Sequence, residues 1–166
     1  MAERNPLPFD PIERAARQWS QHHPETARMR AVTSLMRVHQ LVLSDLDERL
    51  RPLGLTFARY EVLVLLSFSR HGSLSLGKIG ERLQVHATSV TSLVQRLAAA
   101  GLIERRPHPH DGRAVLAALT DQGRQTMEQA TRVITDSGFA LTSLSEEECD
   151  QLSALLRRPR AAAGDF

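Results

Sequence analysis

The chain has little cysteine, few aromatic residues and almost no lysine. A single cysteine, Cys149, excludes an internal disulfide. Aromatic residues make up only 4% of the 166 residues, which argues against an extended stacking platform for single-stranded nucleic acid. Lys78 is the one lysine among 21 Lys and Arg residues, so arginine supplies nearly all the positive charge. The formal net charge of +2 therefore says little until the positions of the arginines are considered.

Long apolar runs are also missing. No stretch approaches the roughly 20 apolar residues of a membrane-spanning helix. The first residues, Met1 to Pro6, lack the apolar stretch of a signal peptide. Hydrophobic residues still amount to 42% of the chain, which is enough for a buried core. We therefore expect a folded, cytoplasmic protein with no membrane partner.

Apolar residues recur at helical spacing over most of the chain. In the long segment 25–51, they repeat every three and four residues as in a heptad seam, with a second apolar stripe beside it. One helix with two apolar faces needs a partner outside its own domain, and a second copy of the chain is one candidate. The predicted helices cover 11–22, 25–51, 57–70, 76–83, 87–100, 121–141 and 146 to about 158.

The middle of the chain has the pattern of a winged helix-turn-helix. Two of the predicted helices, 76–83 and 87–100, are separated by three residues. The period then changes, because two short apolar-rich runs flank a segment rich in turn residues, Pro107 to Arg113. We expect a two-stranded β-wing there. The predicted fold class is therefore mainly α, a winged helix-turn-helix whose flanking N- and C-terminal helices form an α-helical dimerisation layer.

This order of elements divides the chain into four parts. Residues 1–51 would hold a tail, an extra helix and the long dimerisation helix, and residues 52–120 the DNA-binding lobe. Residues 121–158 would complete the dimerisation layer, and 159–166 would form a flexible tail.

Between Arg70 and Arg113, seven cations face three acidic residues, so this segment carries +4 and the remainder −2. Neutralisation of DNA phosphates requires such a concentration of basic charge in the reading lobe.

The polar face of the predicted helix 87–100 suits the major groove of DNA. It carries hydroxyl groups, one amide and one guanidinium, and no Glu or Lys. Hydroxyls reach phosphates and base edges, glutamine pairs with adenine, and arginine pairs with guanine or phosphate. In the wing, Gly112 permits a turn, Arg113 can extend into the minor groove, and Asp111 can hold a neighbouring arginine. The candidate DNA-contacting residues are Ser75, His86, Thr88, Ser89, Thr91, Ser92, Gln95, Arg96, Arg106, Asp111 and Arg113.

These motifs resemble the MarR (multiple antibiotic resistance regulator) family of winged helix-turn-helix transcriptional regulators. The resemblance implies a homodimer that binds double-stranded DNA at a pseudo-palindromic operator and is released by a ligand or by oxidation. It also implies that Arg113 is the minor-groove arginine and Asp111 its organiser. Many relatives carry Ser or Thr where this chain has His86. The similarity spans about 27–158, and its motifs are Leu83 to Leu97, Gly101 to Pro107, Asp111-Gly112-Arg113 and Leu119 to Gly123.

The sequence leaves the regulatory signal open. Cys149 lies among acidic residues that disfavour a thiolate, and the histidine pairs 22–23 and 108/110 lack an evident third ligand, so we expect no metal and no cofactor. The extra N-terminal helix with Trp19 resembles the subgroup that responds to urate and phenolic compounds. That resemblance implies a small anionic aromatic ligand, although Trp19 could instead serve dimer packing alone. The candidate ligand-binding residues are Trp19, Arg37, His39, Arg59, Glu61 and Arg105.

Two other function classes agree less well with the sequence. A winged helix can serve as a protein–protein interaction module, but such a module has no need of the hydroxyl-rich face or of the wing arginine. No Ser-His-Asp arrangement, phosphate loop or metal motif supports an enzyme. The sequence therefore favours a homodimeric, sequence-specific DNA-binding regulator, a repressor that a small anionic aromatic ligand releases.

Overall fold

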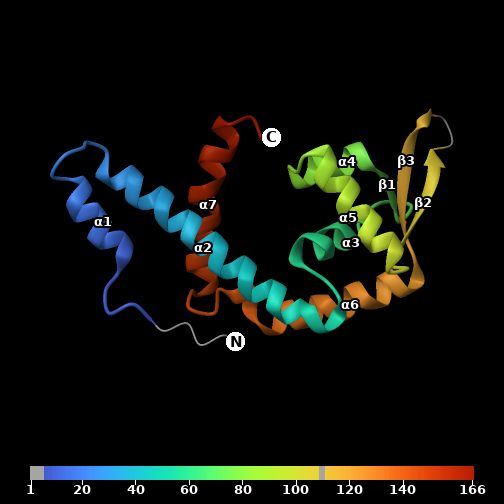
Figure 1. Cartoon of the computed structure of the whole chain (residues 1–166), viewed down its shortest axis with the longest axis horizontal. Helices are drawn as coiled ribbons and strands as arrows, with labels where there is room; N and C mark the ends of the chain where they lie inside the picture. Colours follow the sequence, from blue (N-terminus) through green and yellow to red (C-terminus); the bar gives the residue numbers. More distant parts are fainter. Residues whose placement is uncertain (1–5, 109–110) are drawn as a thin grey trace.

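The structure, a computed structural model, describes residues 6–108 and 111–166, and the side chains of 111–113 lie outside that description. Figure 1 shows α1 and α2 at one end of the molecule, the small sheet at the other, and α6 along the lower edge. The mainly helical fold with a β-wing confirms the predicted fold class. The elements are α1 (Pro11–Trp19), α2 (Thr26–Leu50), η1 (Arg51–Leu53), α3 (Phe57–Ser67), β1 (Ser73–Ser75), α4 (Leu76–Leu83), α5 (Ala87–Ala99), β2 (Ile103–His108), β3 (Asp111–Leu119), α6 (Asp121–Asp136), η2 (Gly138–Ala140) and α7 (Glu146–Ala162).

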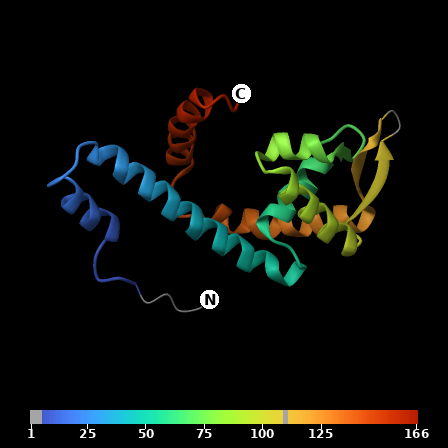
Figure 2. The same ribbon diagram turned by 45° about the horizontal axis from the view of Figure 1, so that its top comes forward.

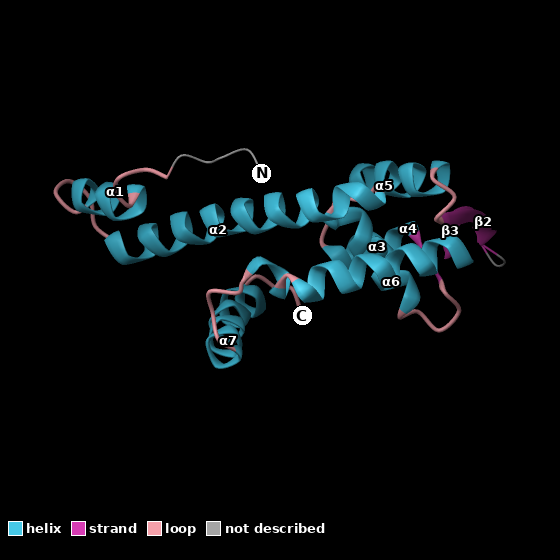
Figure 3. Ribbon diagram, turned by 90° about the horizontal axis from the view of Figure 1, so that it is seen from below, coloured by secondary structure: helices cyan, strands magenta, loops and turns pink. Residues whose placement is uncertain are grey.

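Helix α2 is a long rod that links the N-terminal end of the molecule to the lobe formed by α3, α4, α5 and the sheet. Figure 3 shows it extending away from that lobe, with α1 folded back beside its first turns. Leu46 and Leu50, near its C-terminal end, are fully buried. Val32 and Met36, farther toward its N-terminus, are 55% and 54% exposed. A single chain therefore buries the predicted heptad seam only at its C-terminal end.

Three predicted helices are too long at their C-terminal ends. α1 ends at Trp19 rather than His22, and α3 ends at Ser67 rather than Arg70. α6 ends at Asp136 rather than Leu141, because Gly138 and the two residues after it have positive φ angles of 57°, 52° and 60°. Left-handed residues cannot continue the i to i−4 hydrogen bonding of an α-helix.

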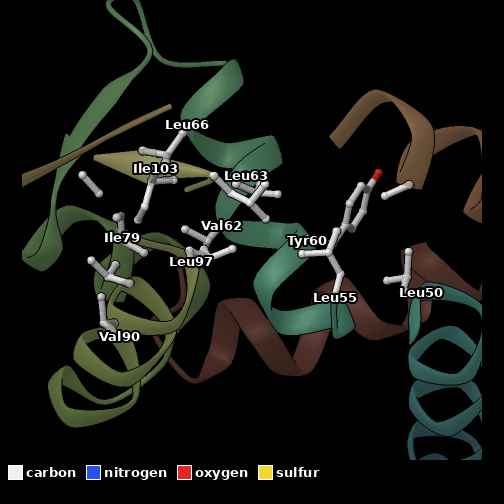
Figure 4. Packing of buried hydrophobic residues seen from close by; sticks show 14 of the residues in the cluster. Leu50, Leu55, Tyr60, Val62, Leu63, Leu66, Ile79, Val90, Leu97 and Ile103 are labelled. Carbon is white, nitrogen blue, oxygen red and sulfur yellow. The ribbon is translucent and has the colours of Figure 1, made fainter. Parts of the chain in front are cut away.

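The core of the lobe lies between α3, α4, α5 and the sheet, and it continues to the end of α2 and into α6 (Figure 4). Periodic apolar positions of the three short helices converge there, which is why these segments fold as helices despite their modest length. The fully buried side chains in this core are Leu46, Leu50, Val62, Leu63, Leu66, Ile79, Val90, Val94, Leu97 and Ile134.

The sheet is antiparallel and has the strand order β1-β3-β2. β2 and β3 form the predicted two-stranded wing, with Ile103 opposite Leu119. The third strand, β1, was not predicted from the sequence. Its central residue Leu74 is buried and lies opposite Ala117 in β3. Three residues are too few to show a period-2 pattern in the sequence. The strand forms because it pairs with β3, some 40 positions later.

Helix α7 extends farther than predicted, to Ala162 rather than about Arg158, and it contains Pro159. The prediction of a flexible tail over 159–166 is therefore wrong for the residues that continue the helix. None of the 17 residues of α7 is buried within the described chain. Figure 2 shows α7 standing apart from the other helices, with its C-terminal end toward α4. Within the described residues, no helix is both long and apolar enough to cross a membrane.

Candidate nucleic-acid interface

The turn between α4 and α5 brings the two helices close together. Gln84 ends α4 in the left-handed conformation, and the Val85 amide donates to the Gly80 carbonyl at 3.1 Å. A Cβ at Gly80 would lie 3.1 Å from the Val85 carbonyl oxygen and 3.3 Å from Cγ2 of Val90. The small residue at position 80 thus permits the close helix-turn-helix packing that sets the angle of α5.

His86 caps the N-terminus of α5. Its Nδ1 lies 2.9 Å from the Thr88 hydroxyl and accepts a longer hydrogen bond, 3.4 Å, from the Thr88 amide. An imidazole nitrogen without a proton accepts such bonds as a Ser or Thr hydroxyl does at this position. The departure from Ser or Thr in the MarR-like motif therefore leaves the cap intact, and the exposed ring stays at the start of the helix.

Helix α5 separates a buried apolar face from an exposed polar face. Val90, Val94 and Leu97 are buried against the lobe. Thr91 is only partly exposed, and its hydroxyl donates to the Ala87 carbonyl at 2.9 Å, so this group is already engaged by its own helix. The exposed candidates on this helix are Thr88, Ser89, Ser92, Gln95 and Arg96.

Ser75 has a structural role at the start of α4. Its hydroxyl accepts a hydrogen bond from the Lys78 amide at 3.4 Å, which is the N-cap arrangement. The Ser75 side chain is partly buried at this cap, beside the exposed Lys78. A backbone N–H group at such a helix start can meet a phosphate, as can the lysine.

The wing arginine Arg106 is paired within its own strand. Nη2 and Nε of Arg106 lie 2.7 and 3.1 Å from one carboxylate oxygen of Glu104. Residues two positions apart on a strand point to the same face, so the pattern that places them together is visible in the sequence. Both side chains are more than half exposed. A phosphate must therefore compete with Glu104 for Arg106, a relationship that the sequence analysis missed.

Asp111 and Arg113 belong to β3 by their backbone. Their side chains lie outside the described part of the structure, and so does all of His110. The assignments of Arg113 to the minor groove and of Asp111 as its organiser therefore stay predictions from the resemblance.

The ligand candidates lie in three separate regions of one chain. Trp19 ends α1, donates from Nε1 to the Pro24 carbonyl at 2.7 Å, and has its ring centroid 4.6 Å from that of His23. Arg37 and His39 are exposed in the middle of α2. From Thr26 to Asp47, where α3 begins to pack, α2 is about 31 Å long at 1.5 Å per residue. One chain therefore does not bring Trp19 to the candidates on α3 and β2.

Two of the remaining candidates lie on α3. Arg59 donates from Nε to the Thr56 hydroxyl at 3.2 Å. Glu61 is partly buried on the same helix, and burial raises the pKa of its carboxyl above the ordinary value. Arg105 is exposed on β2. These three residues share the lobe, whereas Trp19 belongs to α1, and Arg37 and His39 belong to α2.

One hollow in the described part of the structure contains none of these candidates. A hollow of about 420 Å³ on α7 is lined by Ser153, Ala154, Arg157, Arg160 and Phe166. Among the described residues, no three His, Cys, Asp or Glu side chains are grouped so that they could hold a metal ion. Cys149 is partly exposed near the start of α7.

Several known proteins are similar to this chain in sequence and in fold. The model of the MarR family matches residues 53–114. The HTH-type transcriptional repressor MdtR of Bacillus subtilis is 32% identical over 132 residues, which cover 78% of this chain and 83% of MdtR. A MarR family transcriptional regulator from Streptomyces coelicolor is 51% identical, with a TM-score of 0.80 over 84% of this chain and 97% of that one. A mutant of Escherichia coli MarR in complex with operator DNA is 30% identical, with a TM-score of 0.69 over 76% and 90% of the two chains.

These relatives are transcriptional regulators rather than enzymes, as the sequence led us to expect. The exposed polar face of α5, the turn before it and the wing are the surface that the sequence predicts to contact DNA. The chain belongs to the MarR family of winged helix-turn-helix, DNA-binding transcriptional regulators.

Proposed function

We propose that this protein is a homodimeric repressor that binds a pseudo-palindromic operator and is released from it by a small anionic aromatic ligand. The observation that carries the proposal is the juxtaposition of an exposed reading helix with dimerisation helices that one chain leaves uncovered. The proposal that the protein represses transcription is supported by the relative MdtR, which is named a transcriptional repressor.

The uncovered helices are α2 and α7. Helices of this length depend on packing of an apolar face for most of their stability. α7 has no buried residue in its own chain, and Leu155 on it is 62% exposed. A second copy that covers these faces would bury the apolar side chains that α2 leaves 42% to 55% exposed, namely Val32, Leu35, Met36, Val38 and Leu41.

A dimer would present two copies of α5 to one face of the duplex. Recognition helices related by a two-fold axis read half-sites about 10 base pairs apart, one turn of B-DNA. The exposed face carries no acidic side chain, so it can approach the phosphates without like-charge repulsion. The operator that we propose is therefore pseudo-palindromic, with its half-sites centred one helical turn apart.

The ligand site that we propose needs both chains. Trp19 lies far from Glu61 within one chain, so in this proposal the partner's Trp19 forms an aromatic wall beside Glu61. Arg59 and Arg105 supply positive charge for an anionic ligand. The ligand must bind the DNA-free arrangement more tightly than the DNA-competent one, or no release follows.

The dimer is tested by matched substitutions of exposed apolar residues. Val32→Glu places a charge on the uncovered face of α2, whereas Phe68→Glu makes the same change at the end of α3, where the side chain is 82% exposed. We expect light scattering to show a dimer for the wild type and for Phe68→Glu, and a shift to monomer for Val32→Glu. A wild-type monomer at micromolar concentration would contradict the proposed assembly.

The DNA site is tested by selection of duplexes from a random-sequence library with the wild-type protein. We expect enrichment of one inverted repeat. Arg113→Ala should weaken binding to that duplex roughly tenfold and leave the dimer intact. Arg132→Ala, which removes the same charge from exposed α6, should have a much smaller effect. Equal effects of the two substitutions on the affinity for DNA would contradict the assignment of Arg113 to the minor groove.

The ligand is tested with urate and salicylate as probes. We expect at least one of them to raise the thermal midpoint of the wild-type protein and to lower its affinity for the selected duplex. Trp19→Ala should remove both responses. Absence of any response of the wild type to these acids would contradict the ligand class.

A further inference from the structure

The segment that follows α7 folds back toward that helix. Gly164 has a φ of 73°, a left-handed conformation that reverses the chain at little cost for glycine. The Asp165 amide donates to the Arg160 carbonyl at 3.1 Å. Phe166 then lies beneath two guanidinium groups, 4.8 Å from that of Arg157 and 5.4 Å from that of Arg160. These contacts hold the segment against the last turns of α7.

The carboxylate of Asp165 joins two parts of the molecule. Its Oδ2 accepts a hydrogen bond from Nε of Arg160 at 2.6 Å, and its Oδ1 accepts one from the side-chain amide of Gln84. The Asp165 side chain is only 17% exposed, which is low for a surface carboxylate. Gln84 is 81 positions earlier in the chain, at the turn between α4 and α5.

This contact lies on the opposite side of the lobe from its other attachments. The lobe is fastened to the long helices through α3, where the Phe57 amide donates to Asp47 at 2.7 Å and the Tyr60 and Thr131 hydroxyls lie 3.0 Å apart. In Figure 1, α2 and α6 run below the lobe, whereas α7 rises beside it and its end approaches α4. A body attached along one side can rotate about that side, and a second attachment at the far side restricts the rotation.

We propose that Asp165 and Gln84 are positioning residues, which fix the orientation of α5 relative to α7. This inference rests on the homodimer described under Proposed function, in which α7 belongs to the dimer layer. The position of α7 then determines where the turn before α5 lies, and hence the separation of the two recognition helices. Loss of the tether leaves each reading surface unchanged but lets the two lobes adopt a wider range of separations.

The test measures how strongly the protein discriminates between half-site spacings. The probe is the duplex that the wild-type protein selects from a random library, together with versions lengthened or shortened by one and two base pairs at the centre. We expect the wild type to bind its own spacing at least tenfold more tightly than the altered ones. Asp165→Ala and Gln84→Ala should each reduce this ratio to about threefold, and the double variant should not reduce it further, because both remove one contact.

Matched variants separate positioning from general stability. Asp150→Ala removes an acid and Gln151→Ala an amide near the start of α7, and Gln151 donates to Glu147 of the same helix. Both should keep the wild-type ratio. Gln84→Lys retains a donor for the Asp165 carboxylate and should restore the discrimination that Gln84→Ala loses. All variants should remain dimers with thermal midpoints close to that of the wild type.

The possible failures are distinct. If the wild-type protein enriches no sequence, the proposed operator binding fails, and the positioning role fails with it. If a sequence is enriched but Asp165→Ala and Gln84→Ala keep the wild-type spacing ratio, the positioning role alone is overturned. Additive losses in the double variant would also overturn it, because two residues in one contact must be coupled.

Discussion

The side chain of Asp47, near the end of α2, accepts a hydrogen bond at 2.7 Å from the backbone amide of Phe57, the first residue of α3. Thr56, the N-cap of α3, accepts from the Arg59 amide at 3.4 Å. Two residues thus satisfy separate amides at the start of one helix. Helix α2 thereby holds the N-terminus of α3. Because α3 packs in the core of the lobe, this contact fixes the lobe against α2.

Removal of the Asp47 carboxylate should destabilise the protein. Asp47→Ala leaves the partly buried Phe57 amide without its acceptor, a loss of about 1 kcal/mol in the free energy of unfolding. Asp45→Ala is the matched control, because Asp45 pairs with Arg49 at the surface of the same helix, a contact worth a few tenths of a kcal/mol. Urea unfolding of both variants measures the difference. Equal losses would show that the contact with α3 contributes nothing.

Gly123 should not tolerate a side chain. A Cβ there would lie 1.9 Å from the Leu102 carbonyl oxygen and 2.9 Å from its carbonyl carbon, and both of these are backbone atoms that cannot move aside cheaply. Gly123→Ala should therefore lower the stability by several kcal/mol, the range of severe overpacking. Gly77→Ala, in exposed α4 with no atom within 4 Å of the new Cβ, should instead raise it by about 0.5–1 kcal/mol. Equal thermal midpoints for Gly123→Ala and Gly77→Ala would contradict the predicted clash.

Neutralisation of Glu104 should strengthen DNA binding. Glu104→Gln releases Arg106 from its 2.7 Å ion pair and makes it available to a phosphate. An exposed pair is worth up to about 1 kcal/mol, so the affinity for the selected duplex should rise by up to about fivefold. Glu81→Gln removes the same charge from exposed α4 and should raise the affinity less. In a background of Arg106→Ala, the gain from Glu104→Gln should largely vanish, and a gain that persists would contradict the release of Arg106.

The stability of the protein should depend on the ionisation of Glu61. Burial raises the pKa of this carboxyl in the folded state above its ordinary value of 4.5, so the folded state holds the proton more tightly than the unfolded state. Its contribution is therefore fully present below that ordinary value and is lost as the pH rises through the folded pKa. Glu61→Gln should stabilise the protein at neutral pH, and the gain should shrink on acidification. Glu128→Gln makes the same substitution at an exposed site on α6 and is the matched control. A gain in stability for Glu61→Gln that does not change with pH would contradict the raised pKa of Glu61.

Local sequence signals predicted most helices and the exposed polar face of α5. The apolar spacing of Val90, Val94 and Leu97 placed α5, and the same spacing identified its opposite face as the exposed one. Capping signals at Thr120 and Ser145 gave the correct starts of α6 and α7. Such features depend on residues within one or two turns, and the sequence displays these neighbours directly.

The features that escaped prediction depend on residues far apart in the chain. β1 is a strand because Leu74 packs into the core opposite Ala117, and no pattern within its three residues announces it. The ends of α3 and α6 were misplaced, since apolar residues continue past the points where the backbone turns. The contact of Gln84 with Asp165 joins residues 81 positions apart, for which a single sequence carries no local signal.

The sequence by itself determined which segments are helices, which face of α5 stays polar and where the basic charge gathers, because periodicity and composition are local properties. Only the tertiary structure decided that Arg106 is held by Glu104, that His86 completes the cap of α5, and that the segment after α7 reaches the helix-turn-helix. It also decided that one chain leaves Val32 and Leu155 exposed. Burial and hydrogen-bond partners arise from the packing of whole elements against each other, so they become visible only when the chain is folded.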